Sequence, residues 1–237
     1  MLAALLEEQS EINSNRRRGK MQINFLGDSI TEGAGASSHE KMYTAIVCSR
    51  LGAKENNFGK GGTRIAPQIQ KAGDPFGENF ILRAKTMPKD ADFTFVMGGT
   101  NDYGHGDALL GAADDAARDT FCAAFADLAR YMRDNFGKEK VCFILPLPRY
   151  DQDNPYGDGS KKRPQEPLSA YIAAEKAILE KFELPCLNLS DSFPVPEVAG
   201  PTALTVDGLH PNDEGHEMIA ERLVAYLKKN SHHFLTT

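Results

Sequence analysis

Residues 21–33, MQINFLGDSITEG, decide how the chain is organised. The apolar first half predicts a short strand, and Gly27, Asp28, Ser29 and Thr31 are residue types that form turns and cap helices. Ligands of an open α/β sheet bind beyond the carboxyl ends of its strands, so Ser29 has the position of a functional residue. Its hydroxyl becomes chemically useful only if the chain also supplies a base, an orienting acid and oxyanion donors.

Composition indicates a globular protein of ordinary solubility. The chain has 237 residues, of which 41% are hydrophobic and 25% charged, enough for one large α/β domain with a buried core. A net charge of -6 and a pI near 5.6 argue against nucleic acid as a partner, because phosphate binding favours a basic face. No apolar run approaches the roughly 20 residues that cross a bilayer, so we expect no membrane span.

The first 20 residues differ in character from the rest. Glu7 and Glu8 interrupt an early apolar run, and the basic cluster 16–18 follows that run, whereas a signal peptide carries its positive charge first. We therefore expect a cytoplasmic protein with an N-terminal extension over 1–20 that catalysis does not need, one domain over 21–230 and a short tail over 231–237. Nothing in the sequence indicates an oligomeric state.

Apolar segments alternate between strand-like and helix-like spacing along the chain. Beyond the opening strand, the pattern predicts strands at 53–57, 91–97, 140–145 and 184–189. Helices are predicted at 41–51, at 65–87 with an interruption near 73–75, from about 112 to 136, at 168–182 and from Pro211 to about 229. Strands alternating with helices indicate a parallel sheet with helices on both faces.

Polar turns follow these strands. Ser29 comes after the first strand, Gly62 after the second, Asn101 after the third, and His210 precedes the last helix. We expect all four at one rim of the sheet. Alone, Ser29 and His210 could be capping residues, Gly62 a turn glycine and Asn101 part of an Asx-turn. Their joint occurrence favours a functional site.

At these turns the sequence resembles the SGNH or GDSL-type hydrolases, a family of esterases and lipases. Four blocks carry the resemblance, in the family's order: GDSIT (27–31), NFGKGG (57–62), GTND (99–102) and DGLHP (207–211). Ile30 stands where the name motif has Leu. The resemblance implies a three-layer α/β/α fold, flavodoxin-like, with a five-stranded parallel sheet of order 2-1-3-4-5, and a serine esterase without cofactor.

The residues suggest roles in that chemistry. Ser29 is the expected nucleophile, and His210 the base that takes its proton and later protonates the leaving group. Asp207 is expected to hold the other imidazole nitrogen, with a bend at Gly208 turning both side chains the same way.

The expected oxyanion donors are the backbone N–H groups of Ser29 and Gly62 and the side-chain amide of Asn101. Asp28 and Asp102 are expected to brace the turns around Ser29 and Asn101.

The remaining histidines and the cysteines have weaker patterns. His39 and His105 are predicted on loops near the rim, whereas His216, His232 and His233 are predicted to be exposed. The four cysteines are predicted to be small buried side chains without disulfides or metal: Cys48, Cys122, Cys142 and Cys186.

Two other classes of function stay open. A metal-dependent phosphoesterase would use carboxylate, amide and imidazole ligands: Asp28, Asn101, Asp102, His105, Asp207 and His210. We expect no metal, because dinuclear sites usually need more histidines or bridging carboxylates. Residues 59–62 lack the spacing of a phosphate-binding loop. A carbohydrate- or protein-binding module on an esterase fold is the second alternative.

The substrate is expected to be a small-molecule ester. Loops at 98–118 and 146–165 should flank Ser29. Their side chains predict a polar, partly basic rim: Tyr103, Tyr150, Tyr156, Arg149 and the basic run 161–163, although that run is more typical of a solvated loop. Such a rim favours short acyl groups, acetyl above all, on carbohydrates or other small polar alcohols. Lysophospholipase and thioesterase activities are the alternatives within the family.

Overall fold

The computed structural model describes residues 20–68, 78–116 and 119–230. The predicted extension, except Lys20, and the predicted tail lie outside the described residues, together with His232 and His233. Those domain boundaries therefore stay predictions.

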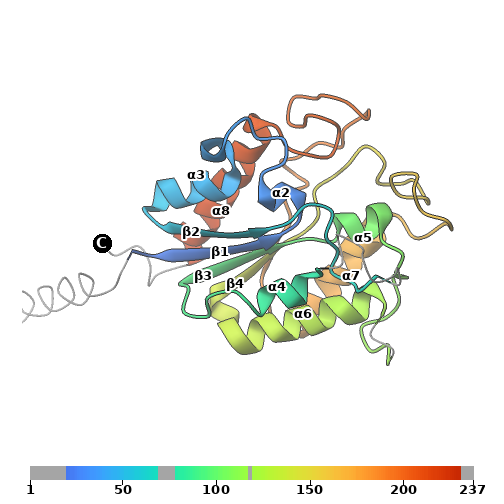
Figure 1. The fold of residues 1–237 in the computed structure, drawn as a ribbon, viewed down its shortest axis with the longest axis horizontal. Coiled ribbons are helices and arrows are strands. Elements are labelled where there is room, and N and C mark those ends of the chain that lie inside the picture. Colours follow the sequence, from blue (N-terminus) through green and yellow to red (C-terminus); the bar gives the residue numbers. More distant parts are fainter. Residues whose placement is uncertain (1–19, 69–77, 117–118, 231–237) are drawn as a thin grey trace, which may run out of the picture.

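A five-stranded parallel sheet forms the centre of the molecule (Figure 1). Its strands are β1 (Gln22–Gly27), β2 (Lys54–Gly59), β3 (Phe93–Met97), β4 (Val141–Ile144) and β5 (Cys186–Leu187). The order is β2-β1-β3-β4-β5, which confirms the predicted topology. Gly27 pairs with both Gly59 and Met97, so the carboxyl ends of the first three strands are level. The turns that follow these strands consequently start at one rim.

Helices cover both faces of the sheet and complete the predicted three layers (Figure 1). One face packs against α3 (Tyr43–Leu51) and α8 (Asp213–Asn230), the other against α4 (Phe80–Ala84), α6 (Phe121–Phe136) and α7 (Leu168–Lys181). Most residues of the central strands β1 and β3 are apolar because both faces of these strands are buried. Asn24 and Thr94 are buried polar exceptions. Short elements complete the set: α2 (Ser29–Glu32), α5 (Thr100–His105), η1 (His39–Lys41) and η2 (Lys138–Lys140).

Three predicted elements differ from the structure. Residues 65–68 are not helical, because Pro67 disfavours helical backbone at Ala66, and the only helix in the described part of 65–87 is α4. The helix expected from about 112 begins at Phe121, where the Thr120 hydroxyl caps the first turn. β5 is limited to two residues.

His216 was predicted to be exposed, and that prediction is wrong. Its side chain is wholly buried between α8 and α3, stacked on the ring of Tyr43. Nδ1 accepts the Tyr43 N–H at 3.2 Å and Nε2 lies 3.2 Å from the carbonyl oxygen of Ala34. The histidine therefore links the last helix to the loop that follows α2.

All four cysteines are free thiols; three are buried and Cys186 is half-buried. Across residues 20–68, 78–116 and 119–230, no helix is both long and apolar enough to traverse a bilayer.

Candidate active site

Ser29 is the first residue of α2, directly after β1. Asp28 caps this helix by accepting the N–H of Ile30 at 3.1 Å. Gly27 has no room for a side chain, because a Cβ there would lie 1.8 Å from the hydroxyl of Thr31. Burial raises the pKa of Asp28 to about 6, although its hydrogen bond to Ile30 and the charges of His210 and Arg83 lower it. The turn thus presents the Ser29 side chain at the sheet rim.

The hydroxyl of Ser29 contacts His210, and His210 contacts Asp207. Ser29 Oγ lies 2.9 Å from Nε2, and Nδ1 lies 2.7 Å from Asp207 Oδ2. The other carboxylate oxygen of Asp207 accepts the N–H groups of Leu209 and His210, at 2.9 and 2.7 Å. Burial alone would raise the pKa of Asp207, but its hydrogen bonds with His210 and Leu209 lower it below the usual value. The carboxylate is ionised at neutral pH and faces the imidazole.

Asp207 and His210 lie in a tight turn just before α8. A long connection separates this turn from the end of β5. Val206 donates its N–H to the carbonyl of His210 at 2.9 Å. Gly208 has a φ of 81°, a left-handed conformation that favours glycine, and its carbonyl accepts the N–H of Tyr150 at 3.1 Å. This bend turns the Asp207 and His210 side chains toward each other.

The turn after β2 lies beside Ser29. A Cβ on Gly61 would lie 3.6 Å from Cβ of Ser29, and the Gly61 N–H donates to the carboxylate of Glu32 at 2.7 Å. Gly62 is left-handed, with a φ of 71°. Its N–H has no acceptor among the residues that the structure describes. Among the described residues, the Gly62 N–H is therefore an unused donor in the turn beside the serine.

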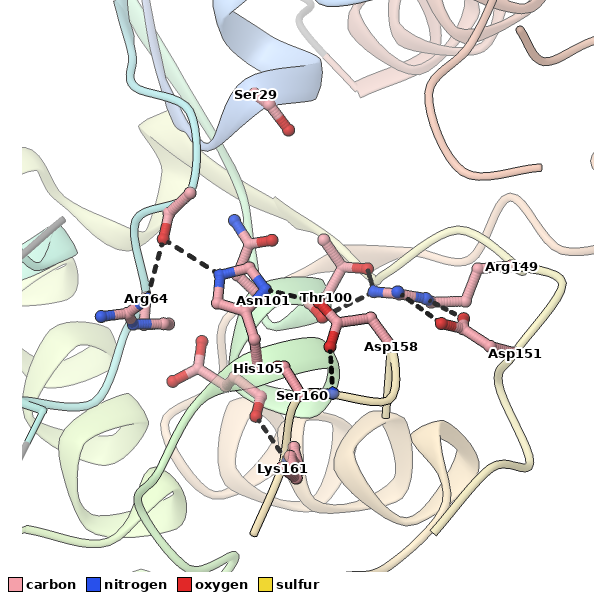
Figure 2. Close-up of polar contacts among 12 residues, drawn as sticks. Ser29, Arg64, Thr100, Asn101, His105, Arg149, Asp151, Asp158, Ser160 and Lys161 are labelled. Atoms are coloured by element: carbon pink, nitrogen blue, oxygen red, sulfur yellow. Dashed lines mark hydrogen bonds and ion pairs between the residues drawn. The ribbon is translucent and has the colours of Figure 1, made fainter. Parts of the chain in front are cut away.

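Asn101 is buried in the first turn of α5, and Figure 2 shows its amide between Ser29 and the imidazole of His105. Its Nδ2 donates to the carbonyl of Thr63 at 3.0 Å, which leaves the second amide hydrogen for another acceptor. The expected oxyanion residues Ser29, Gly62 and Asn101 thus belong to three neighbouring segments.

Asp102 braces a different segment from the one predicted. Its carboxylate accepts the N–H groups of Ile65 and Ala66, each at 2.9 Å. Burial raises the pKa of Asp102 to about 7, although the same hydrogen bonds lower it. Asp102 therefore fixes the chain just after Gly62 and affects the site by holding that loop in place.

Arg83 on α4 is part of this framework, and no sequence motif indicated it. Its Nη1 donates to the carbonyl of Gly27 at 2.7 Å and to that of Phe58, and its Nη2 to the hydroxyl of Thr63 at 2.7 Å. One side chain thereby fixes the ends of β1 and β2 and the residue after Gly62.

The polar rim predicted from the 146–165 loop is only partly present. Arg149 is 2% exposed, because it forms an ion pair with Asp151 and donates to the carbonyl of Thr100 at 3.0 Å. Tyr103 is buried too, and its hydroxyl donates to backbone carbonyls of that loop. The prediction that these two side chains line the rim is wrong. Tyr150 and Tyr156 are exposed.

The candidate metal ligands do not form a cluster. The described part of the chain has no group of three or more His, Cys, Asp or Glu side chains placed to hold one ion. The Asp28 and Asp102 carboxylates accept backbone N–H groups instead. The two histidines predicted on loops lie in short helices instead: His39 begins η1 and His105 ends α5. His39 pairs with Glu55 at 2.8 Å on the surface, whereas His105 lies at the site.

Three solved structures illustrate the similarity of this fold to those of known proteins. A protein from Lactobacillus plantarum is 27% identical, with a TM-score of 0.70 over 92% of this chain and 100% of its own. The lipase/acylhydrolase from Enterococcus faecalis is 21% identical, with a TM-score of 0.56 over 88% of this chain and 96% of its own. The acetyl xylan esterase AlAXEase is 18% identical, with a TM-score of 0.61 over 87% of this chain and 100% of its own.

A search of curated proteins found no match. The model of the GDSL-like Lipase/Acylhydrolase family matches residues 25–218, which include all four sequence blocks and nearly the whole sheet. The chain therefore belongs to the GDSL-like lipase/acylhydrolase family and is a carboxylic ester hydrolase.

Proposed function

We propose that this hydrolase is a serine esterase that works through an acyl-enzyme intermediate. The observation that carries the proposal is the continuous contact from Ser29 Oγ through His210 to Asp207, at 2.9 and 2.7 Å. A serine hydroxyl is a weak nucleophile until a neighbouring base takes its proton, and an imidazole at hydrogen-bond distance can do so.

In the first half-reaction, Ser29 Oγ attacks the ester carbonyl carbon while its proton moves to Nε2 of His210. Asp207 stabilises the imidazolium that forms. The carbonyl oxygen becomes an oxyanion and accepts hydrogen bonds from the Ser29 N–H, the Gly62 N–H and the Asn101 amide. The imidazolium then protonates the leaving alcohol as the carbon–oxygen bond breaks.

In the second half-reaction, water replaces the alcohol. His210 takes a proton from the water, which attacks the acyl carbon of the Ser29 ester. The same donors stabilise the second oxyanion, and the returning proton releases Ser29 and the carboxylic acid.

We propose short acyl groups, acetyl above all, on carbohydrates or other small polar alcohols as the substrate class. Support comes from Tyr150 and Tyr156, whose exposed rings and hydroxyls suit a sugar. The backbone N–H of Tyr150 also donates to the carbonyl of Gly208, two residues before His210. The exposed side chains of Val198 and Val206, near Gly208, favour the second candidate, a longer acyl chain as in a lysophospholipid or thioester.

Two assays test the proposal. Hydrolysis of p-nitrophenyl acetate should be lost in Ser29→Ala and unchanged by EDTA; loss in EDTA with activity retained in Ser29→Ala would support a metal-dependent phosphoesterase. Absence of turnover on any ester or phosphate would support the binding module. A series of p-nitrophenyl esters should peak at acetate or butyrate, and a peak at octanoate or longer would contradict the short-acyl class.

A further inference from the structure

His105 lies between two hydrogen-bond acceptors at the edge of the site (Figure 2). Its Nε2 is 3.4 Å from the carbonyl oxygen of Gly62, and its Nδ1 is 3.3 Å from Oδ2 of Asp158. We call this set of contacts, Gly62–His105–Asp158, the His105 bridge. The bridge joins the expected oxyanion turn to the loop that follows Arg149.

Asp158 is held in place independently of His105. Its N–H donates to the carbonyl of Gly104 at 2.9 Å, and its Oδ1 accepts the N–H of Ser160 at 3.0 Å. A Cβ on Gly157 would lie 2.0 Å from the Gly104 oxygen, so the loop packs directly on the backbone of α5. Only Oδ2 of Asp158 is therefore directed at the imidazole.

Hydrogen bonds to the Gly62 carbonyl control the orientation of this residue. Gly62 has a φ of 71°, and fixing its carbonyl fixes its other backbone dihedral, so the whole residue keeps one orientation. Its carbonyl also accepts from Arg64 Nη1 at 3.3 Å. If the Gly62 N–H is an oxyanion donor, as the proposed function requires, these contacts determine how well it is aimed.

A neutral imidazole has one N–H and one lone pair, whereas both neighbours of His105 are acceptors. Neutral His105 can therefore satisfy Gly62 or Asp158, but not both, and the imidazolium can satisfy both at once. We propose that His105 is a positioning residue for the oxyanion site, which holds Gly62 when both of its ring nitrogens carry protons and releases it when Asp158 takes the single remaining N–H.

Burial and the charges around His105 determine the pH at which the imidazolium loses its second proton. Burial lowers the pKa of His105 below its ordinary value of 6.5, and Arg64 and Arg149 add to this, whereas the Gly62 hydrogen bond and the Asp158 carboxylate raise it. In the neutral form, the N–H should face Asp158, because a hydrogen bond to a charged acceptor is stronger than one to a carbonyl. Positioning should therefore be lost as the pH rises through the pKa of His105.

Asp158→Asn separates this proton effect from a purely structural role. The Ser160 N–H should hold the new amide with its oxygen toward Ser160 and its nitrogen toward Nδ1 of His105. The amide then donates to Nδ1, the single imidazole proton moves to Nε2, and neutral His105 donates to Gly62 at every pH.

The experiment compares kcat between pH 5 and 8.5 on p-nitrophenyl acetate for wild type, His105→Ala and Asp158→Asn, with His39→Ala as a control. His39 also pairs with a carboxylate, but on the surface. Each kcat is expressed as a ratio to wild type at the same pH, so effects common to all variants cancel. A hydrogen bond of this kind changes kcat by about 3- to 10-fold. We expect His105→Ala to be lower by that factor below the pKa of His105 and equal to wild type at pH 8, and Asp158→Asn to exceed wild type by that factor at pH 8.

A ratio that is independent of pH for either site variant would overturn the proposal, as would a pH-dependent ratio for His39→Ala. NMR distinguishes failure of the His105 proposal from failure of the proposed serine mechanism. The Gly62 amide signal should follow the titration of His105 in both wild type and Ser29→Ala, and should not titrate in His105→Ala. Ester hydrolysis by Ser29→Ala would refute the serine mechanism alone, whereas a Gly62 signal that ignores His105 would refute the bridge alone.

Discussion

The side-chain amide of Asn101 donates to the carbonyl oxygen of Thr63 at 3.0 Å, so the residue that follows β3 holds the loop that follows β2. This bond uses one amide hydrogen, and the amide that carries the other lies between Ser29 and the imidazole of His105 (Figure 2). The amide is therefore preorganised before a substrate arrives, which is the condition under which an oxyanion donor is most effective.

Asn101→Ala should lower kcat by about 100- to 1,000-fold while KM changes little, because the lost donor acts mainly on the oxyanion. Steady-state kinetics on p-nitrophenyl acetate will measure both constants, and thermal unfolding will show whether the loss of the Thr63 bond affects folding. An unchanged kcat would remove Asn101 from the oxyanion site.

Gly208→Ala should lower kcat by at least about 10-fold, because a Cβ there would lie 2.4 Å from the carbonyl oxygen of Val198 and would move the turn between Asp207 and His210. Gly137→Ala is a matched control: Gly137 has a similar φ of 84°, but a Cβ there meets nothing within 4 Å. Both variants carry backbone strain, so only the difference in kcat reports on the site. Equal kcat values would show that the turn tolerates displacement.

Arg83→Met should destabilise the fold by about 3 kcal/mol, because the carbonyls of Gly27 and Phe58 and the hydroxyl of Thr63 lose a shared donor. Urea unfolding measures the difference. Arg50→Met, which breaks an exposed pair with Glu217, should cost less than about 1 kcal/mol. Similar decreases in the free energy of unfolding of the two variants would mean that Arg83 stabilises the fold no more than an exposed ion pair does.

His216 should make the fold less stable in mild acid. Burial lowers the pKa of His216 in the folded state, so below pH 6.5 the unfolded chain binds the proton more readily than the folded one. Stability is therefore full above pH 6.5 and decreases as the pH falls toward the folded-state pKa. Urea unfolding at pH 7.5 and 5.5 should show a smaller decrease in His216→Gln than in wild type; equal decreases would assign the effect to other groups.

The turns at strand ends were predictable because local chemistry determines them. The Gly-Asp-Ser turn after β1 and the position of Asn101 after β3 follow from strand patterns and turn residues alone. The predicted strand order also agrees with the structure, although it came from the family resemblance.

The framework around the site was less predictable. Arg83 donates hydrogen bonds to carbonyls of two strands that are far from it in the sequence, and no spacing along the chain predicts such contacts. Arg149 is buried only because Asp151 and Thr100 satisfy it, which depends on how the loop packs on α5. A signal for His216 did exist: it precedes Ile219 and Ala220 by three and four residues, the spacing of the buried face of α8.

The most direct test of the serine mechanism is to locate the adduct formed with a fluorophosphonate ester by peptide mass spectrometry. The proposed mechanism predicts one adduct, on Ser29, formed with loss of p-nitrophenyl acetate hydrolysis, much slower in His210→Ala and absent in Ser29→Ala. Full hydrolytic activity with Ser29 unmodified, or inactivation through an adduct on another residue, would contradict it.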